Sequence, residues 1–287
     1  MKKILVTGAN GQLGQSFQKL SKNSEQFEFI FTDSDTLDIS NKEAVQDFFW
    51  QHEPHFCINA AAYTAVDLAE TEIEKAFLIN ADGTENLAEA CAEYNSQFIH
   101  VSTDYVFDGE NQLEYTEEDF PNPMGVYGAS KLSGEELAIE ANPCTVIVRT
   151  SWVYSEFGKN FVKTMLQLFA SKDELNIVAD QFGQPTNAND LAEAIMEIVK
   201  SGKIVPGIFN FSNFGKISWF DFAQKIAELS NSTIKLHAIE TTQYPTPAKR
   251  PKNSTLDLEK IVKTYAVQLK DWEESLSETI KLIQENK

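Results

Sequence analysis

The stretch Val6-Thr-Gly-Ala-Asn-Gly-Gln-Leu-Gly14 decides the fold of this chain. It continues the apolar run Ile4–Val6 and leads into a segment with helical character. The spacing of Gly8, Gly11 and Gly14 suits a tight turn whose backbone approaches a diphosphate while the next helix packs close to the strand. The N-terminus of that helix would offer N–H groups and a positive dipole end to the phosphates. The motif predicts a dinucleotide-binding turn; a glycine turn that only packs a helix is the alternative.

Short apolar runs alternate with helical patterns over the first half of the chain. Each run is mostly apolar rather than alternating, which is typical of strands that are covered on both faces. This order predicts an α/β fold with a doubly wound, Rossmann-like parallel sheet in a dinucleotide-binding domain over residues 1–150. The predicted strands are Ile4–Thr7, Phe27–Thr32, Phe56–Ala60, Phe98–Ser102 and Thr145–Thr150.

The best-marked helix is predicted over Asn41–His52. Ser40 and Glu43 have the spacing of a capping box, and Pro54 would end the helix. The residues expected on its apolar face are Val45, Phe48 and Phe49.

The pattern changes after about residue 150 and predicts a smaller, mainly substrate-binding lobe over residues 151–287. Some of its segments are expected to return to the first domain. The predicted helices are Asn160–Ser171, Asn189–Ser201, Ser218–Ser230 and one near Trp272–Gln284, and the predicted strands are Leu175–Ala179 and Ile208–Phe211. A loop rich in Pro and Thr spans Tyr244–Pro251.

The charge of the chain excludes some classes of partner. Lys and Arg total 24 against 43 Asp and Glu, which gives a net charge of −19. A chain this acidic repels nucleic acid and anionic membranes, so we expect neither as a partner. An anionic ligand would need local positive groups, and the only arginines are Arg149 and Arg250. Each arginine is either a phosphate contact or a member of a structural ion pair.

The cysteines and the N-terminus indicate a cytoplasmic protein. Cys57, Cys91 and Cys144 show no metal-ligand spacing, and an odd, sparse set favours reduced thiols. No apolar run is long enough to span a bilayer, and Met1 is followed almost at once by a strand rather than by the apolar region of a signal peptide.

Several residues are candidates to bind the dinucleotide. Asp33 ends the second predicted strand, about twenty residues beyond the glycines, where it would accept hydrogen bonds from the adenosine ribose. A carboxylate there repels a 2′-phosphate, so NADH is favoured over NADPH; an ordinary turn aspartate is the alternative. Asp38 and Ile39 would lie near the adenine. The small residues of Asn59–Ala62 would let the backbone approach the cofactor, unless they serve tight packing alone.

Tyr127 and Lys131 are candidates for proton transfer. Their i, i+4 spacing places them on one face of a helix. A nearby ammonium, helped by an oxidised nicotinamide, would lower the pKa of the phenol by about three units, which requires roughly 4 kcal/mol. Tyr127 would then give its proton to a carbonyl oxygen as hydride arrives. Thr103 ends a strand where it can hold that carbonyl; a surface contact between Tyr127 and Lys131 is the alternative.

These residues resemble the extended short-chain dehydrogenase/reductase family. The resemblance spans nearly the whole chain, and its later segments are specific to a nucleotide-sugar reductase branch. The segments that carry it are Val6–Gly14, Asn59–Asp67, Ser102–Gly109, Val126–Glu135, Arg149–Tyr154, Asp180–Thr186 and Arg250–Ser254.

The resemblance implies NAD(P)H-dependent reduction of the C4 ketone of dTDP-4-dehydro-L-rhamnose to dTDP-L-rhamnose. Tyr127 would be the proton donor, with Lys131 and Thr103 beside it. The cofactor-binding residues that the motifs or the resemblance lead us to expect are Gly8, Gly11, Gln12, Leu13, Gly14, Asp33, Asp38, Ile39, Ala60, Ala61, Ala62, Tyr63, Thr64, Tyr127 and Lys131. The expected substrate-binding residues are Thr103, Asp104, Trp152 and Arg250. Trp152 would offer its apolar face to a deoxysugar, or it is a core aromatic.

Some relatives form a dimer through a magnesium ion that acidic residues hold. The residue after the glycine turn here is the neutral Gln15, which argues against a bound metal, and the chain is expected to be a monomer or a homodimer. Two other functions are considered. One is a related nucleotide-sugar reductase or epimerase. The other is a non-catalytic regulatory subunit like that of methionine adenosyltransferase, which resembles the same family.

Overall fold

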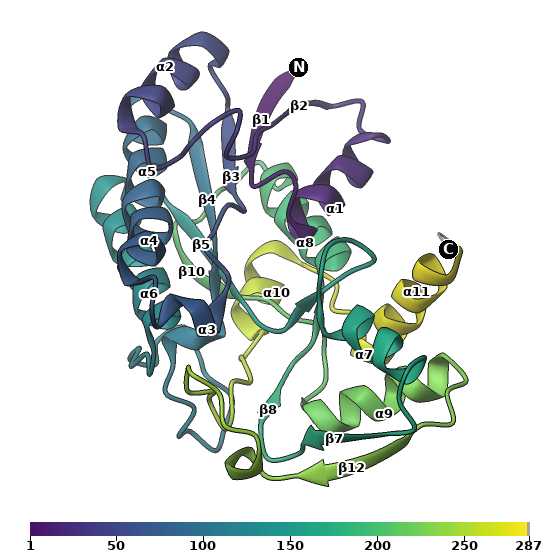
Figure 1. Ribbon diagram of the computed structural model, residues 1–287. Helices are drawn as coiled ribbons and strands as arrows, with labels where there is room; N and C mark the ends of the chain where they lie inside the picture. The colour runs from purple at the N-terminus through teal and green to yellow at the C-terminus, as the bar shows by residue number, and fades with distance from the viewer. Residues whose placement is uncertain (286–287) are drawn as a thin grey trace.

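The computed structural model describes residues 1–285, and its centre is a parallel sheet of six strands in the order β10-β5-β4-β3-β1-β2. Helices cover both faces of this sheet (Figure 1). The strands are β1 (Lys2–Thr7), β2 (Phe27–Phe31), β3 (Phe56–Asn59), β4 (Gln97–Thr103), β5 (Val146–Thr150) and β10 (Gly207–Asn210). The predicted α/β class and doubly wound parallel sheet are confirmed.

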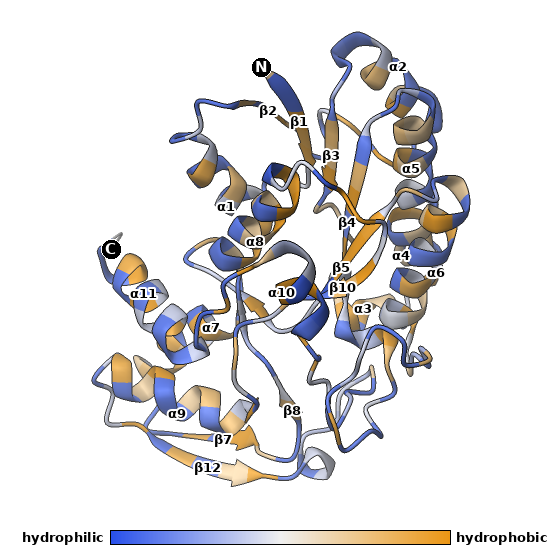
Figure 2. Cartoon of the chain, turned by 180° about the vertical axis from the view of Figure 1, so that it is seen from behind, coloured by the Kyte–Doolittle hydropathy of each residue, from blue (hydrophilic) through white to orange (hydrophobic). Residues whose placement is uncertain are grey.

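Alternate residues of each central strand face opposite helical layers. In β1, Ile4 and Val6 pack with α1 (Gln12–Ser21), α8 (Ala188–Lys200) and α10 (Glu259–Tyr265). Leu5 points the other way, into a cluster with α2 (Lys42–His52), α5 (Gly83–Glu93) and α6 (Val126–Ala141). Both faces of the sheet are therefore covered, and the central strands β3 and β5 are apolar until their last residues (Figure 2).

The predicted helix over Asn41–His52 forms as α2, but its predicted cap is wrong. Asn41 is the N-cap, and its side chain accepts a hydrogen bond from the N–H of Ala44. The Ser40 hydroxyl instead donates to the Asp38 carboxylate, 2.7 Å away, so it is not free to cap the helix. Asn and Ser compete for the same role at a helix start, and spacing alone does not separate them.

Short helical segments lie in two connections, the one between β3 and β4 and the one between β4 and α6. They are α3 (Val66–Ala69), α4 (Ile73–Phe77), the π-helical turn η1 (Leu78–Asp82) and the 3-10 turn η2 (Asp104–Val106). The turn η2 follows the carboxyl end of β4 directly, so the chain changes direction at the edge of the sheet where ligands of α/β proteins bind.

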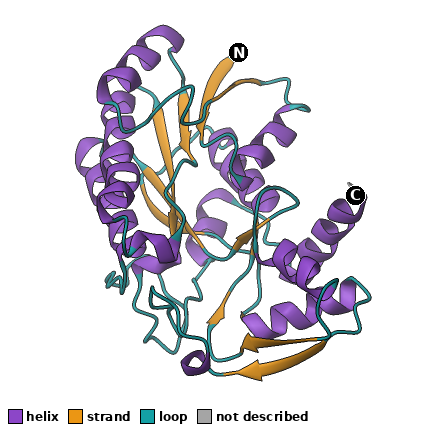
Figure 3. Cartoon of the chain, in the orientation of Figure 1, coloured by secondary structure: helices purple, strands orange, loops and turns teal. Residues whose placement is uncertain are grey.

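A second lobe is built on a small sheet with its own apolar core (Figure 3). Strands β7 (Glu174–Val178) and β12 (Lys235–Ile239) pair in parallel. Helices α7 (Phe161–Phe169), α9 (Trp219–Leu229) and α11 (Trp272–Glu285) contribute to its core. The remaining short elements are β6 (Val153–Tyr154), β8 (Phe182–Gly183), β9 (Thr186–Asn187), β11 (Ile217–Ser218) and η3 (Thr241–Gln243).

The chain returns to the large sheet after residue 150. Strand β10 pairs with β5, and helix α8 packs against α1. The predicted helices of the second half form as α7, α8, α9 and α11, and the two predicted strands form as β7 and β10. The domain division at residue 150 stays a prediction. Of residues 1–285, no helix is long and apolar enough to cross a membrane.

Candidate active site

The glycine turn lies between β1 and α1, as predicted. Gly8 has a φ of +67°, and a Cβ at this position would lie 2.6 Å from the carbonyl oxygen of Ala60. The N–H of Gly11 donates to the carbonyl of Gly8 at 3.0 Å, which closes the turn. Within residues 1–285, no side chain forms a capping hydrogen bond at the start of α1, where the N-cap is Gly11. The first N–H groups of α1 therefore face a turn whose shape and charge fit a diphosphate.

The side chain of Gln12, at the first position of α1, reaches into the second half of the chain. Its Nε2 donates to the carbonyl of Val153 at 3.2 Å. Its Oε1 accepts from the hydroxyl of Ser155 at 3.0 Å and from the amide of Asn160 at 2.8 Å. The glycine turn is thus fixed to the segment that leads into α7. Next to Gln12, Leu13 and Gly14 are buried in the contact between α1 and the sheet.

Asp33 follows β2 at the same edge of the sheet. Its carboxylate accepts hydrogen bonds from Thr36 and from the N–H of Asp35, and also one from Asn10. These bonds, the one from the Thr36 hydroxyl above all, hold the pKa of Asp33 below its ordinary value. Asp33 is therefore a carboxylate at neutral pH, as the predicted ribose contact requires. The neighbouring Asp38 is exposed and Ile39 is buried.

The small residues after β3 lie beside the glycine turn. Ala60, Ala61 and Ala62 are partly exposed and Thr64 is exposed. Tyr63 is buried, and its N–H donates to the side chain of Asn80 at 2.8 Å. Because β1 and β3 are neighbours, the structure brings this predicted segment and the glycine turn to one edge.

Tyr127 lies in the first turn of α6, close to the end of β4. Burial has the largest influence on the pKa of Tyr127 and, with the charge of Asp104, raises it to about 12. The nearby hydroxyl of Thr103, the last residue of β4, partly offsets this change. The expected lowering of this pKa by Lys131 is not found, because the amino group of Lys131 is bound elsewhere.

Lys131 lies one turn further along α6 and is 2% exposed. Its Nζ donates to the carbonyl of Val101 at 2.8 Å and lies 3.1 Å from Nε2 of His100. Burial lowers the pKa of Lys131 to about 8, and the charge of Glu135 partly offsets this change. Residues 103, 127 and 131 therefore converge at the end of β4, as the sequence predicts.

Asp104 is buried beside Thr103. One carboxylate oxygen accepts from the Thr103 hydroxyl at 3.0 Å, and among the described residues the other has no hydrogen-bond partner. Burial raises the pKa of Asp104 to about 6, although the nearby hydroxyls of Ser254 and Thr103 oppose the change. A buried carboxylate oxygen without a partner is costly, and a bound hydroxyl group would satisfy it.

We expect Asp104→Asn to stabilise the protein above pH 7 and not below pH 4. The folded state holds the Asp104 proton more tightly than the unfolded chain does, so stability is lost as pH rises from about 4 to about 6. Removal of this group should increase the free energy of unfolding at pH 7.5 by up to about 3 kcal/mol. Urea unfolding at pH 4 and pH 7.5 measures this change. The same gain at both pH values, or in the exposed control Asp47→Asn, would contradict it.

Trp152 has an unusual backbone conformation and a stacked ring. Its φ is +46°, in the left-handed region that bulky residues rarely adopt. The indole stacks on Trp219, with ring centroids 3.5 Å apart and an angle of 6° between the planes. A Cβ at Gly183 would lie 2.5 Å from the indole, so this glycine makes room for the ring. Trp152 is partly exposed.

The two arginines have different surroundings. Arg149 is 1% exposed and pairs with Glu135 at 2.6 Å, so it forms the structural ion pair that the sequence left open. Arg250 is partly exposed and holds Asp67 with two bonds of 2.8 Å. Its position in the loop opposite α3 leaves its predicted role as a substrate contact open to experiment.

Sequence reasoning missed the polar residues beneath the site. His100 lies within β4, and Asn80 within η1; both are fully buried. The signal for His100 was available, because a histidine interrupts the apolar strand Phe98–Ser102. Glu135 closes the segment Val126–Glu135, but its pairing with Arg149 follows from the packing of α6 on the sheet rather than from sequence spacing.

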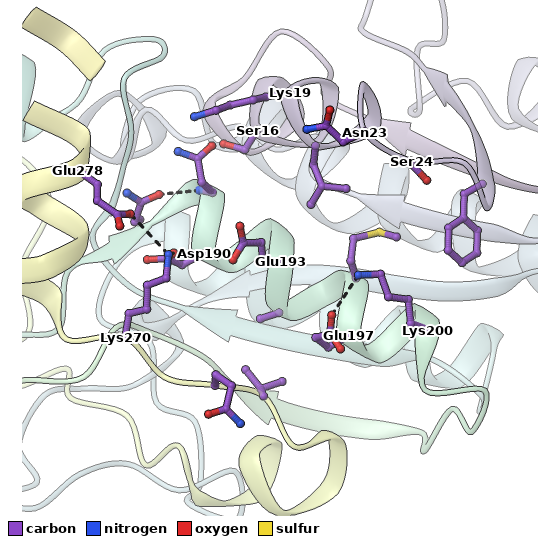
Figure 4. Close-up of a pocket in the computed structure, with 18 of the residues that line it drawn as sticks. Ser16, Lys19, Asn23, Ser24, Asp190, Glu193, Glu197, Lys200, Lys270 and Glu278 are labelled. Atoms are coloured by element: carbon purple, nitrogen blue, oxygen red, sulfur yellow. Dashed lines mark hydrogen bonds and ion pairs between the residues drawn. The ribbon is translucent and has the colours of Figure 1, made fainter. Parts of the chain in front are cut away.

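A large cavity lies away from Tyr127 and Lys131. It measures about 990 Å³ and is open to one side, between α1, α8 and the segment 266–270 (Figure 4). Its charged side chains include two ion pairs, Lys270 with Asp190 at 2.9 Å and Lys200 with Glu197 at 3.1 Å. None of the three residues Thr103, Tyr127 or Lys131 lines it.

The fold and the site define a class of protein, a short-chain dehydrogenase/reductase with a dinucleotide turn after β1 and a Tyr–Lys pair on α6. A model of the RmlD substrate binding domain matches residues 1–285. The chain belongs to this family.

This chain is similar over nearly its whole length to named proteins and to proteins of known structure. A dTDP-4-dehydrorhamnose reductase of Aggregatibacter actinomycetemcomitans is 44% identical over 286 residues, which cover 96% of this chain and 97% of the relative. The crystal structure of a dTDP-4-dehydrorhamnose reductase from Clostridium acetobutylicum has a TM-score of 0.95 at 44% identity and covers 98% and 99% of the two chains. A dTDP-4-dehydrorhamnose reductase from Bacillus anthracis in complex with NADP has a TM-score of 0.93 at 37% identity and covers 98% and 100%.

Proposed function

We propose that this chain reduces the C4 ketone of dTDP-4-dehydro-L-rhamnose to dTDP-L-rhamnose with NADH or NADPH. The observation that carries the proposal is the convergence of Thr103, Tyr127 and Lys131 at the end of β4, on the same sheet edge as the glycine turn. The names of the similar proteins supply the substrate, since each is a dTDP-4-dehydrorhamnose reductase.

The residues of the site divide the work of a ketone reduction. A bound nicotinamide supplies the hydride. Thr103 would turn its hydroxyl away from Asp104 and donate a hydrogen bond to the ketone oxygen, which orients that oxygen toward Tyr127. Tyr127 then gives its proton to that oxygen as the alkoxide develops. Burial keeps Tyr127 in the phenol form, which is the form that an acid needs. Lys131 donates to the nicotinamide ribose and so holds the cofactor against the ketone.

The proposed cofactor site follows the edge of the sheet from β2 to β4. Gly8, Gly11 and the N-terminus of α1 would hold the diphosphate, and Asp33 the adenosine ribose. Further contacts are proposed at Gln12, Leu13, Gly14, Asp38, Ile39, Ala60, Ala61, Ala62, Tyr63 and Thr64.

The substrate site would lie above the same edge, toward the second lobe. The unpartnered oxygen of Asp104 would accept from a sugar hydroxyl, and the indole of Trp152 would pack on the deoxysugar. Arg250 would contact the diphosphate if it leaves Asp67. The cytoplasm is the proposed compartment, a monomer or homodimer is the proposed state, and no metal is proposed.

We expect Asp33→Ser to move cofactor use toward NADPH. The carboxylate of Asp33 would disfavour NADPH by repelling its 2′-phosphate. The ratio of kcat/KM for NADPH to that for NADH should rise roughly tenfold. Steady-state kinetics with each cofactor measures the ratio. Asp35→Ser removes the same charge two residues away and should leave the ratio unchanged; equal shifts in both variants would remove Asp33 from the choice.

The proposed function is tested with dTDP-4-dehydro-L-rhamnose and each reduced cofactor. We expect a steady loss of absorbance at 340 nm and a stoichiometric yield of dTDP-L-rhamnose. An epimerase would isomerise its sugar without a net loss of NADH. A regulatory subunit would bind the dinucleotide, show no turnover and co-purify with a synthetase; either outcome would overturn the proposal.

A further inference from the structure

The side chain of Gln12 crosses from the glycine turn to the second lobe. The main chain of Gln12 forms the first position of α1, where the N–H groups face the proposed diphosphate site. Its side-chain amide lies against the segment 153–160, which runs from β6 to the start of α7. One residue therefore lies at the proposed cofactor site through its main chain and contacts the second lobe through its side chain.

A main-chain carbonyl fixes the direction of the Gln12 amide. Nε2 lies 3.2 Å from the carbonyl oxygen of Val153, which can only accept, so this atom must be the nitrogen. Oε1 then faces the side-chain nitrogen of Asn160 at 2.8 Å and the hydroxyl of Ser155 at 3.0 Å. The Asn160 amide is fixed in turn, because its oxygen accepts from the N–H of Lys163 and its nitrogen also donates to the carbonyl of Ser155. The bonds of Gln12 to residues 153 and 160 therefore have a defined donor and acceptor.

One side chain of the second lobe holds both ends of this segment. Trp219 stacks on Trp152, just before the segment, with ring centroids 3.5 Å apart. Phe161, just after the segment, packs on the same indole with centroids 4.7 Å apart. Between these ends, Gly158 lies against the stem of Gln12, since a Cβ at Gly158 would lie 3.2 Å from Cγ of Gln12. The ends of the segment are therefore attached to the second lobe and its middle to the first.

We infer that Gln12 is a positioning residue that couples the cofactor site to the sugar-nucleotide site by fixing the segment beside Trp152 to the glycine turn. The inference rests on the proposed function for the role of Trp152 as a substrate contact. A dinucleotide bound at the N-terminus of α1 would order the main chain of Gln12, and the hydrogen bonds of its amide would extend this order to residues 153–160. The cofactor would then raise the affinity for the sugar nucleotide, because part of the ordering is already complete when the sugar binds.

A second contact joins the same segment to the first lobe. Glu156 accepts from Lys19 of α1 at 2.7 Å and from Asn189 of α8 at 2.9 Å. The Lys19 side chain is 45% exposed, so water screens its charge. This contact should keep the segment close to α1 when the amide of Gln12 is removed. A Gln12 variant therefore tests how well the segment is ordered rather than whether it is attached.

Loss of the Gln12 amide should not unfold the segment. The hydroxyl of Ser155 also lies 3.2 Å from the carbonyl oxygen of Phe157, which can accept its hydrogen bond instead. The side-chain nitrogen of Asn160 keeps two main-chain acceptors, the carbonyls of Ser155 and Phe157. Gln12→Met keeps the length of the side chain, removes its hydrogen bonds to the second lobe and leaves neither of these donors without an acceptor.

Hydrogen exchange of the segment tests the inference directly. In the parent protein, we expect saturating NADH to slow amide exchange in residues 8–14 and, by about tenfold, in residues 153–160. In Gln12→Met, NADH should slow exchange in residues 8–14 only. Gln18→Met is the matched control and should behave like the parent protein, because Gln18 donates to the carbonyl of Ala9 at 2.8 Å within the first lobe. A parent protein in which NADH leaves residues 153–160 unchanged, or a Gln12→Met variant in which it still slows them, would overturn the inference.

Steady-state kinetics supplies a readout that a loss of stability would not give. Gln12→Met should raise the KM for dTDP-4-dehydro-L-rhamnose about tenfold and keep kcat and the Kd for NADH within about threefold of the parent values. Asn160→Ser removes the partner of Gln12 but keeps a residue that caps α7, so it should raise the KM in the same way. The double variant should raise the KM no further than the larger single change. Additive increases, or a fall in kcat at unchanged KM, would contradict the coupling. Absence of turnover in a parent protein that shows the expected exchange pattern would instead overturn the proposed function.

Discussion

Replacement of Tyr127 by Phe should lower kcat by about 10²–10⁴ and leave the Kd for NADH close to that of the parent protein. The substitution removes only the hydroxyl that donates the proton, and the ring keeps its place in the first turn of α6. Without this donor, the alkoxide must take its proton from water. Steady-state assays with dTDP-4-dehydro-L-rhamnose measure kcat, and quenching of tryptophan fluorescence measures the Kd.

Tyr105→Phe is the matched control for this experiment. The ring of Tyr105 lies edge-on to that of Tyr127, with centroids 5.5 Å apart. The Tyr105→Phe substitution therefore removes a second hydroxyl from the same region. We place no proton transfer on Tyr105 and expect its loss to change kcat by less than about tenfold. Parent-like turnover in Tyr127→Phe, or equal losses in the two variants, would remove Tyr127 from the chemistry.

Arg149→Ala should lower the free energy of unfolding by about 3–5 kcal/mol, the largest loss of stability we expect from a single substitution. Arg149 and Glu135 are 1% and 2% exposed, and the guanidinium group bonds both carboxylate oxygens. Its removal leaves the carboxylate of Glu135 buried and unpaired between α6 and the sheet. Urea unfolding at pH 7.5 measures the change.

Two further variants separate charge pairing from packing. The double variant Glu135→Leu with Arg149→Met replaces the buried pair by apolar groups of similar size, so it should recover most of the loss. Lys200→Ala breaks the exposed pair with Glu197 and should cost less than about 1 kcal/mol. A loss in the double variant as large as that in Arg149→Ala would show that packing, not the unpaired charge, sets the effect.

The fold was predictable because its signals are local. Apolar runs such as Ile4–Thr7 and Phe98–Ser102 identify buried parallel strands without knowledge of their neighbours. The left-handed φ of Gly8 follows from its place in a tight turn. The cap of α2 was missed because Ser40 and Asn41 both suit a helix start, and only the bond from Ser40 to Asp38 decides between them.

The candidate site was predictable where chain direction alone places residues together. Thr103 ends β4, and Tyr127 opens α6, so both meet at the carboxyl edge of the sheet. The pKa of Tyr127 was predicted in the wrong direction. Spacing shows that Lys131 shares a helix face with the phenol, but it does not show that His100 and Val101 bind the amino group. These two partners lie on β4 rather than on α6, and the spacing of residues along α6 does not reveal contacts with a strand.

The proposed reacting groups and the proposed substrate contacts lie on different kinds of structure. Thr103, Tyr127 and Lys131 are held by β4 and α6, whereas Trp152 and Arg250 lie on irregular segments. Loops accept insertions and substitutions that a packed sheet does not. Substitutions in these loops would therefore change which sugar nucleotide fits, while the sheet and α6 keep the proposed reacting groups in place.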